Sequence, residues 1–274
     1  MRISVLLLFS ILLSSCTQVF FQPHSFLIDT PEHHGIEYQI ESFEASDGTI
    51  LNAWFLPAKD KVKATVLFLH GNAENISTHF RSIMWMPAKG FNVLALDYRG
   101  YGASEGKPSL KGVQLDIDAA MRSLLAHEGV DPDRIVILGQ SLGGALAIHY
   151  VAHSVYKNNI RALIIDSAFY DYRQIAKEKF NASFITWPFQ WLPWLTIENG
   201  YSPAASVAAI SPIPLLLMHG EQDVVVPQHH SQQLYEQAGK PKELWLVAGP
   251  GHTQSLNKEE TREKLIDYLL RYIE

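Results

Sequence analysis

Short apolar runs alternate with helix-like stretches along most of this chain, and this alternation constrains the fold more than any other feature. Six runs of four or five residues are rich in Val, Ile and Leu, as in strands buried on both faces: 65–69, 92–96, 134–138, 161–165, 214–218 and 244–247. Helical patterns follow four of them, at 113–127, 142–156, 228–238 and 258–273. The alternation predicts a mostly parallel sheet with helices on both faces and reactive groups at the carboxyl ends of the strands.

Two further strands are expected near the start of the domain. Segments 36–43 and 50–56 flank the turn Ser46-Asp47-Gly48-Thr49 and are predicted to form an antiparallel hairpin, which brings the sheet to eight strands. The chain has 274 residues, 47% of them hydrophobic, which suits one large α/β domain or two small ones. We place a single domain at 32–274. A net charge of −6 without a Lys/Arg run excludes a nucleic-acid partner from the expected functions.

The N-terminus has the pattern of an export signal. Arg2 precedes the apolar run 3–13, which is too short for a comfortable membrane span. The run ends at Leu13-Ser14-Ser15-Cys16, which resembles the bacterial lipobox, and Cys16 is the only cysteine of the chain. We predict a lipoprotein signal peptide at 1–15, lipidation of Cys16, a tether at 16–31 and a lipid-anchored location in a bacterial cell envelope. A plain secretory signal or an uncleaved anchor is the alternative.

Thr17 follows the predicted lipidation site. An aspartate at this position favours retention at the inner membrane in enterobacterial lipoproteins, which this segment resembles. With Thr17 there instead, an outer-membrane location is slightly preferred in a Gram-negative cell.

A long insertion, about 167–212, interrupts the alternation of strands and helices. It contains the aromatic-rich stretch 184–195, and insertions of this length inside a compact domain are usually lids or substrate-binding segments. One interpretation is a helix packed on the sheet as ordinary core. The other is an apolar cap that lines an acyl pocket or touches lipid, since dense aromatics are costly to expose without a ligand. Pro188 and Pro193 argue against one long helix.

The sequence Gly139-Gln140-Ser141-Leu142-Gly143 joins the strand-like run 134–138 to the helix-like stretch after it. A tight strand-to-helix turn of this kind exposes a serine hydroxyl, so Ser141 is the predicted nucleophile. A second Gly-x-Ser-x-Gly match at 102–106 has no strand leading into it and is predicted to be a turn.

A nucleophilic serine needs a histidine base, and the base needs a carboxylate. His252 follows the last strand in a Gly/Pro loop and is the predicted base; His219 also ends a strand and stays open. Asp223 is the predicted acid because the order Ser141, Asp223, His252 is that of one hydrolase class, with Glu221 as its local alternative and Asp166 as an outside candidate.

Backbone amides are expected to bind the developing oxyanion. One is the N–H of Leu142, directly after the serine. The other belongs to Asn72 or Ala73 in the turn His70-Gly71-Asn72-Ala73, unless that turn is purely structural. The nearby stretch 97–104 is assigned a structural role, with Asp97 and Arg99 paired.

Taken together, these motifs resemble the α/β-hydrolase superfamily from residue 36 to the end of the chain. Their order is His-Gly-Asn-Ala at 70–73, Asp-Tyr-Arg-Gly-Tyr-Gly-x-Ser at 97–104, Gly-Gln-Ser-Leu-Gly-Gly at 139–144, His-Gly-x-x-Asp at 219–223 and Gly-x-Gly-His at 249–252. The second motif is similar to the serine-aminopeptidase-like branch, which includes monoacylglycerol lipase-like and depalmitoylase-like enzymes. The resemblance implies Ser141 as nucleophile, Asp223 as acid, His252 as base, and an oxyanion hole at Asn72 and Leu142.

Three functions follow as hypotheses. The first is a serine hydrolase of ester or thioester bonds in small acyl or lipid-like substrates, acting through an acyl-enzyme without metal or organic cofactor. The second is a serine peptidase, for which Glu178 and Glu198 of the insertion could hold a free amino terminus. The third is a non-catalytic envelope lipoprotein that serves as a binding module.

Overall fold

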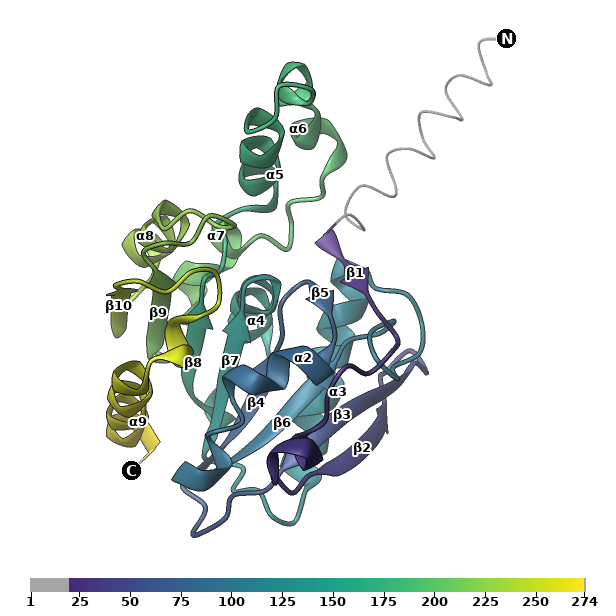
Figure 1. Ribbon diagram of the computed structural model, residues 1–274, viewed down its shortest axis with the longest axis vertical. Helices are drawn as coiled ribbons and strands as arrows, with labels where there is room; N and C mark the ends of the chain where they lie inside the picture. Colours follow the sequence, from purple (N-terminus) through teal and green to yellow (C-terminus); the bar gives the residue numbers. More distant parts are fainter. Residues whose placement is uncertain (1–19, 274) are drawn as a thin grey trace.

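An eight-stranded sheet forms the centre of the computed structural model, which describes residues 20–273 (Figure 1). Its strands are β2 (Gln39–Glu44), β3 (Ile50–Leu56), β4 (Ala64–Leu69), β6 (Phe91–Asp97), β7 (Ile135–Gln140), β8 (Ile160–Asp166), β9 (Leu215–Gly220) and β10 (Lys242–Val247). They lie in the order β10-β9-β8-β7-β4-β6-β3-β2. Only the pairings β2–β3 and β3–β6 are antiparallel. The predicted mostly parallel sheet is confirmed.

Helices cover both faces of the sheet. On one face lie α3 (Leu110–Ala126), α4 (Leu142–His153) and α8 (His229–Gln237), and on the other α2 (Ile76–His79) and α9 (Glu259–Ile273). The central strand β4 serves both layers, since Leu67 and Leu69 pack with the first group while Val66 and Phe68 pack with the second. Burial on both faces explains why the strands are continuously apolar in sequence.

The predicted insertion consists of a projecting part and a returning part. Helix α5 (Tyr172–Asn181), the 3₁₀ helix η6 (Trp187–Phe189) and helix α6 (Leu192–Thr196) extend beyond the carboxyl ends of the strands (Figure 1). We call residues 172–197 the cap. Pro188 and Pro193 lie in the first turns of η6 and α6, which divides the segment into short helices. The returning part, α7 (Pro203–Ser206) and the following 3₁₀ turn, packs on α4 and buries Val207 and Ile210.

Residues 20–31, the described part of the predicted tether, run along the domain. Strand β1 (Gln22–Pro23) pairs in parallel with β5 (Ala73–Glu74), and Phe21 is buried. Asp29 accepts a 2.6 Å hydrogen bond from Arg81. The predicted signal peptide at 1–15 and the predicted lipidation site Cys16 lie outside the described residues. Within 20–273, no helix combines the length and the apolar character needed to cross a bilayer.

Arg99 does not pair with Asp97, so that prediction is wrong. The Arg99 guanidinium instead donates to Asp116 and Asp47, at 2.7 Å each. Asp97 turns the other way: its Oδ1 accepts the backbone N–H of Ile76 at 2.9 Å, and burial raises its pKa to about 7. The sequence pattern missed Asp116 because this partner lies on α3, away from the motif.

The second Gly-x-Ser-x-Gly match forms the predicted turn. Ser104 is buried, donates to the carbonyl of Asp97 at 2.7 Å and accepts the N–H of Asn52 at 2.8 Å. Its hydroxyl therefore holds the end of β6 against β3.

Candidate active site

Ser141 occupies the junction between β7 and α4 with φ 53° and ψ −116°, a left-handed conformation that a residue with a side chain rarely adopts. The two flanking glycines permit this turn. A Cβ on Gly143 would overlap the carbonyl oxygen of Leu69, and a Cβ on Gly139 would come within 2.6 Å of the Gly143 carbonyl oxygen. The motif is therefore required by close backbone packing, and it presents the Ser141 hydroxyl at the carboxyl edge of the sheet.

Two loops bring a histidine and a carboxylate to this serine. His252, after β10, has Nε2 2.8 Å from Ser141 Oγ, and its Nδ1 lies 2.7 Å from Asp223 Oδ2 in the loop after β9. Since a carboxylate only accepts, His252 carries its proton on Nδ1 and donates it to Asp223. The Nε2 lone pair then faces the serine hydroxyl. The structure thus brings the three predicted residues together in one chain of hydrogen bonds.

Asp223 receives four hydrogen bonds. The N–H groups of Val225 and Val226 donate to Oδ1 at 2.8 and 2.9 Å, and His219 Nε2 lies 3.2 Å from Oδ2. Burial by itself raises the pKa of Asp223, but the hydrogen bonds from His219 and His252 outweigh it and hold this pKa well below its usual range. The carboxylate is therefore ionised throughout the neutral range.

His219 has a fixed tautomer. Its Nε2 lies 2.8 Å from the carbonyl oxygen of Val226, which can only accept, so Nε2 carries the proton. Its Nδ1 is 2.7 Å from Ser231 Oγ, whose hydroxyl donates to it. The buried His219 lies against Asp223 and is a positioning group for it, which answers the question its sequence position left open.

The two alternative carboxylates lie elsewhere. Glu221 is exposed, and Asp166 is buried beneath the serine, where Oδ1 accepts from Ser255 at 2.7 Å and Oδ2 from Gln140 at 3.2 Å. Gln140 also donates to the carbonyl of Thr253 at 3.2 Å. Asp166 therefore joins Gln140, the residue before Ser141, to Ser255, while the Gln140 amide reaches the residue after His252.

The predicted oxyanion residues, Asn72 and Leu142, line the same cavity as Ser141. Leu142 opens α4, where N–H groups have no acceptor within the helix. The N–H of Asn72 has no acceptor within residues 20–273, while its carbonyl accepts the Tyr101 hydroxyl at 2.7 Å and its Oδ1 accepts the N–H of Gln22 at 2.8 Å. These bonds fix the turn from both sides. Ala73, the alternative donor, belongs to β5 and pairs with Gln22.

A cavity of about 590 Å³ opens above Ser141. Its walls are mostly apolar. They come from the N-terminal segment, the turn after β4, the start of α4, the segment after β8, the cap and the loop after β9 that carries Asp223, which we call the acid loop; they include Phe20, Leu142, Phe169, Ile175, Phe180 and Val226. Lys179 is the only lysine, arginine, aspartate or glutamate among the residues that line it. The cavity therefore suits an uncharged, apolar acyl group.

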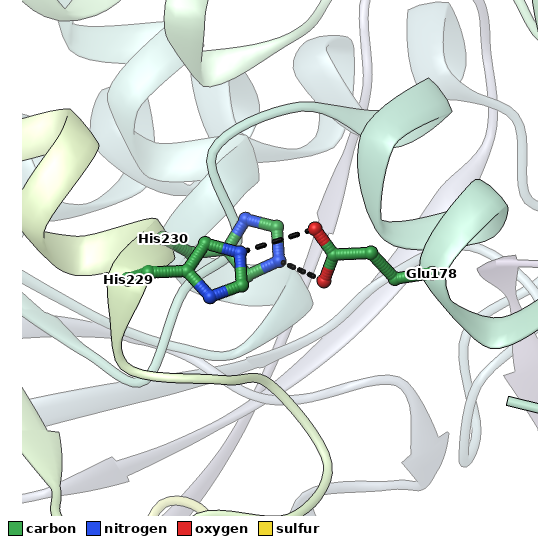
Figure 2. A group of neighbouring side chains, drawn as sticks. All are labelled: Glu178, His229 and His230. Atoms are coloured by element: carbon green, nitrogen blue, oxygen red, sulfur yellow. Dashed lines mark hydrogen bonds and ion pairs between the residues drawn. The ribbon is translucent and has the colours of Figure 1, made fainter. Parts of the chain in front are cut away.

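Three side chains outside this cavity have the residue types of a metal site. Glu178 of α5 contacts His229 Nε2 at 3.1 Å and His230 Nε2 at 3.0 Å, as Figure 2 shows. However, His230 Nδ1 accepts the backbone N–H of Tyr170 at 3.1 Å, which leaves the proton on Nε2 and no lone pair there for a metal. The donor set fits a hydrogen-bonded connection between the cap and α8, which we call the latch.

Comparison with known proteins agrees with this geometry. The family described as serine aminopeptidase, S33, matches residues 60–211. The uncharacterized protein YfhR of Escherichia coli (strain K12) is 37% identical over 235 residues, covering 83% of this chain and 79% of YfhR. The chain belongs to the S33 family of α/β hydrolases.

A second relative and a solved structure extend the S33 comparison. The α/β hydrolase domain-containing protein WAV2 of Arabidopsis thaliana is 34% identical, covering 76% of this chain and 69% of WAV2. The Pyrococcus furiosus esterase Pf2001 superposes with a TM-score of 0.76 at 24% identity, covering 93% of this chain and 99% of that one. This structural likeness shows the shared fold.

Three residues that line the cavity were not predicted from the sequence. Phe20 and Gln22 come from the segment interpreted as a tether, and His79, from the short helix α2, lines the cavity while its Nε2 lies 2.8 Å from the carbonyl of Ala73. For the N-terminal segment, the available signal was the aromatic pair Phe20-Phe21. Strand β1 is two residues long, too short to produce a pattern.

Proposed function

We propose that this S33-family chain is a serine hydrolase that cleaves ester or thioester bonds of acyl substrates. The observation that carries the proposal is the hydrogen-bonded series Ser141–His252–Asp223 at the floor of an apolar cavity. The 2.8 Å contact between Ser141 Oγ and the basic nitrogen of His252 is the arrangement that a nucleophilic serine needs.

The reaction proceeds in two acyl transfers. Ser141 Oγ attacks the carbonyl carbon while its proton passes to His252 Nε2, and Asp223 stabilises the imidazolium. The N–H groups of Leu142 and Asn72 hold the oxyanion. As the intermediate collapses, His252 gives the proton to the alcohol or thiol, which leaves, and the acyl group stays on Ser141. Water then attacks the acyl carbonyl with His252 as base; His252 returns the proton to Ser141 Oγ as the ester bond to the serine breaks and the carboxylic acid leaves.

The cavity favours an acyl substrate over a peptide with a free amino terminus. An aminopeptidase needs a carboxylate to hold the substrate ammonium, and the residues lining this cavity include neither Asp nor Glu. Of the predicted carboxylates, Glu178 is bound to His229 and His230, and Glu198 is exposed. Lys179 would repel an ammonium group. A binding module without activity is the competing function. A binding module would not need Ser141 to hold a strained backbone conformation.

Labelling of the serine tests the reaction. A fluorophosphonate should modify Ser141, and the protein should hydrolyse p-nitrophenyl esters faster than aminoacyl p-nitroanilides. Ser141→Ala should lower ester turnover by about 10³-fold or more while leaving the melting temperature equal or higher, because the strained residue loses only its hydroxyl. A folded protein that neither reacts with the probe nor turns over esters would be the binding module.

We further propose that Cys16 carries a lipid that anchors the mature protein in a bacterial cell envelope. The lipobox-like residues 13–16 and the single cysteine support this proposal. Metabolic labelling with a fatty acid should mark the wild-type protein and not Cys16→Ser; labelling of both proteins would show another site of modification.

A further inference from the structure

The end of the cap is an exposed aromatic surface without a charged residue. We call residues 182–197 the cap tip; this segment contains no Asp, Glu, Lys or Arg. Phe184 is 94% exposed and Ile185 81%, and Trp187, Phe189, Trp191 and Trp194 are each more than half exposed. Such a concentration of large apolar side chains marks an interaction surface.

The substrate cavity does not account for this surface. The cap contributes Ile175, Ala176, Lys179 and Phe180 to the cavity, all from α5, whereas the exposed aromatics of the cap tip lie beyond it. In Figure 1 the segment from α5 to α6 stands away from the sheet. The acyl pocket and the aromatic surface are therefore separate features of one element.

The chemistry of the cap tip fits the interface of a lipid bilayer. Tryptophan and phenylalanine favour the boundary between headgroups and acyl chains. The Trp191 ring N–H is satisfied at 3.1 Å by the carbonyl of Pro188, so this side chain enters an apolar phase without an unpaired donor. Helices η6 and α6 are only three and five residues long, which suits shallow insertion.

The base of the cap carries exposed positive charge, which suits contact with an anionic membrane surface. Lys177 and Lys179 are exposed on α5, and Glu178 between them is engaged in the latch with His229 and His230. Glu198 is the exposed acidic residue at the other end of the cap tip. The two lysines can contact lipid headgroups while the aromatics enter the interface.

The short chain between Cys16 and Phe20 limits how far a lipid on Cys16 can lie from the cap. Phe20 packs edge-on against Tyr172 at the first turn of α5, with ring centroids 4.9 Å apart. Cys16 precedes Phe20 by four residues, which reach at most about 14 Å. Helix α5 has ten residues and rises about 15 Å. A bilayer that holds a lipid on Cys16 is therefore within reach of the cap tip.

We propose that the cap tip docks into the interface of an anionic bilayer and thereby sets the mouth of the cavity against the lipid surface. The docking surface would be a second membrane contact, separate from the N-terminal lipid. This inference deepens the proposed function and rests on it for the anchor at Cys16 and for an acyl substrate delivered from the bilayer.

Tryptophan fluorescence of the full chain in vesicles tests the docking. Vesicles of phosphatidylethanolamine and phosphatidylglycerol with brominated acyl chains should quench the wild-type protein, because three of the six tryptophans, Trp187, Trp191 and Trp194, lie in the cap tip. Trp54 and Trp245 are buried in the domain, and Trp85 is half-buried outside the cap. Phe184→Ser/Ile185→Ser removes apolar contacts without removing a tryptophan and should reduce the quenching at least twofold. The matched control Ile40→Ser/Val155→Ser removes two apolar side chains outside the cap, 65% and 84% exposed, and should leave quenching unchanged.

Equal quenching in the cap variant and the wild type, or none in either, would overturn the docking. So would a dimer in solution that the cap substitutions dissolve, since the surface would then belong to a second copy. Turnover of p-nitrophenyl butyrate, measured without vesicles, keeps the two proposals apart: the cap variant should retain it. Loss of turnover in every sample would reject the hydrolase while leaving the quenching result intact.

Discussion

At the scale of single residues, the chemistry depends on how one carboxylate is held. Asp223 accepts two backbone N–H groups and two imidazole N–H groups, so each oxygen has two donors. Three of these donors come from the short segment 219–226, and the fourth is His252. The orientation of His252 is therefore set by a carboxylate that has little freedom to rotate.

Replacing His219 should weaken catalysis without changing the residues that contact the substrate. His219→Leu removes one donor from Asp223 and should lower kcat/KM about tenfold, since a hydrogen bond to a charged group contributes about 1.5 kcal/mol or more. His219→Gln keeps an N–H donor and should lose less. Ester kinetics and thermal melts of both variants test this; wild-type kcat/KM in a folded Leu variant would contradict it.

The sequence located residues that the structure brings together where a local motif forces the geometry. Ser141 is determined by its two glycines, and His252 and Asp223 by their positions after strands. It failed for Arg99, whose partners Asp116 and Asp47 are 17 and 52 positions away. Such pairings depend on how helices and turns pack, which a pattern in one segment does not contain.

At the scale of elements, the latch joins the cap to the helix that follows the acid loop. Burial lowers the pKa of His230 to about 4, so this histidine is neutral near pH 7 and donates its Nε2–H to the Glu178 carboxylate. The connection is a charge-assisted hydrogen bond between α5 and α8, and the neutral ring also lets Nδ1 accept the backbone N–H of Tyr170.

Acid should destabilise the fold partly through His230. Its ordinary pKa is 6.5 and its folded pKa about 4, so between these values the unfolded chain binds more protons and the free energy of unfolding falls as pH falls. His230→Gln can still donate to Glu178 but does not titrate, so it should lose about 1–3 kcal/mol less over this window. Urea unfolding at pH 7 and pH 4.5 measures the difference. Identical pH dependence would show that His230 does not contribute.

Elements were predictable in proportion to their length and regularity. The predicted strand 50–56 matches β3, and the other strands of the sheet differ from their predicted ranges by at most three residues at either end. The two-residue strands β1 and β5 were missed, because their pairing is a tertiary contact across about fifty positions. The cap was located by its composition, but its separation into a projecting and a returning part followed from packing.

At the scale of the whole molecule, the framework of the site lies outside the cap tip. Ser141 comes from the β7–α4 junction, Asp223 and His252 from the loops after β9 and β10, and the oxyanion turn follows β4. Asp166 and Gln140 hold these parts together beneath the sheet edge. The cap supplies walls to the cavity, through α5, and leaves the hydrogen-bonded series intact.

Shortening the cap should therefore separate folding from membrane contact. Replacing residues 183–195 by a short Gly/Ser linker removes mainly exposed side chains, so the melting temperature should change by only about 2–4 °C. Turnover of p-nitrophenyl butyrate should stay within about threefold of the wild type. Thermal melts and ester kinetics test both statements; loss of fluorophosphonate labelling at Ser141 would mean that the segment supports the site after all.

This arrangement separates the framework of the site from the exposed segment between α5 and α7. Because the chain returns to the domain through α7 and β9, we expect changes between α5 and α7 to leave Ser141, His252 and Asp223 in their places. The charge-free sequence from 182 to 197, for which we propose a lipid environment, therefore belongs to the same element whose first helix lines the cavity.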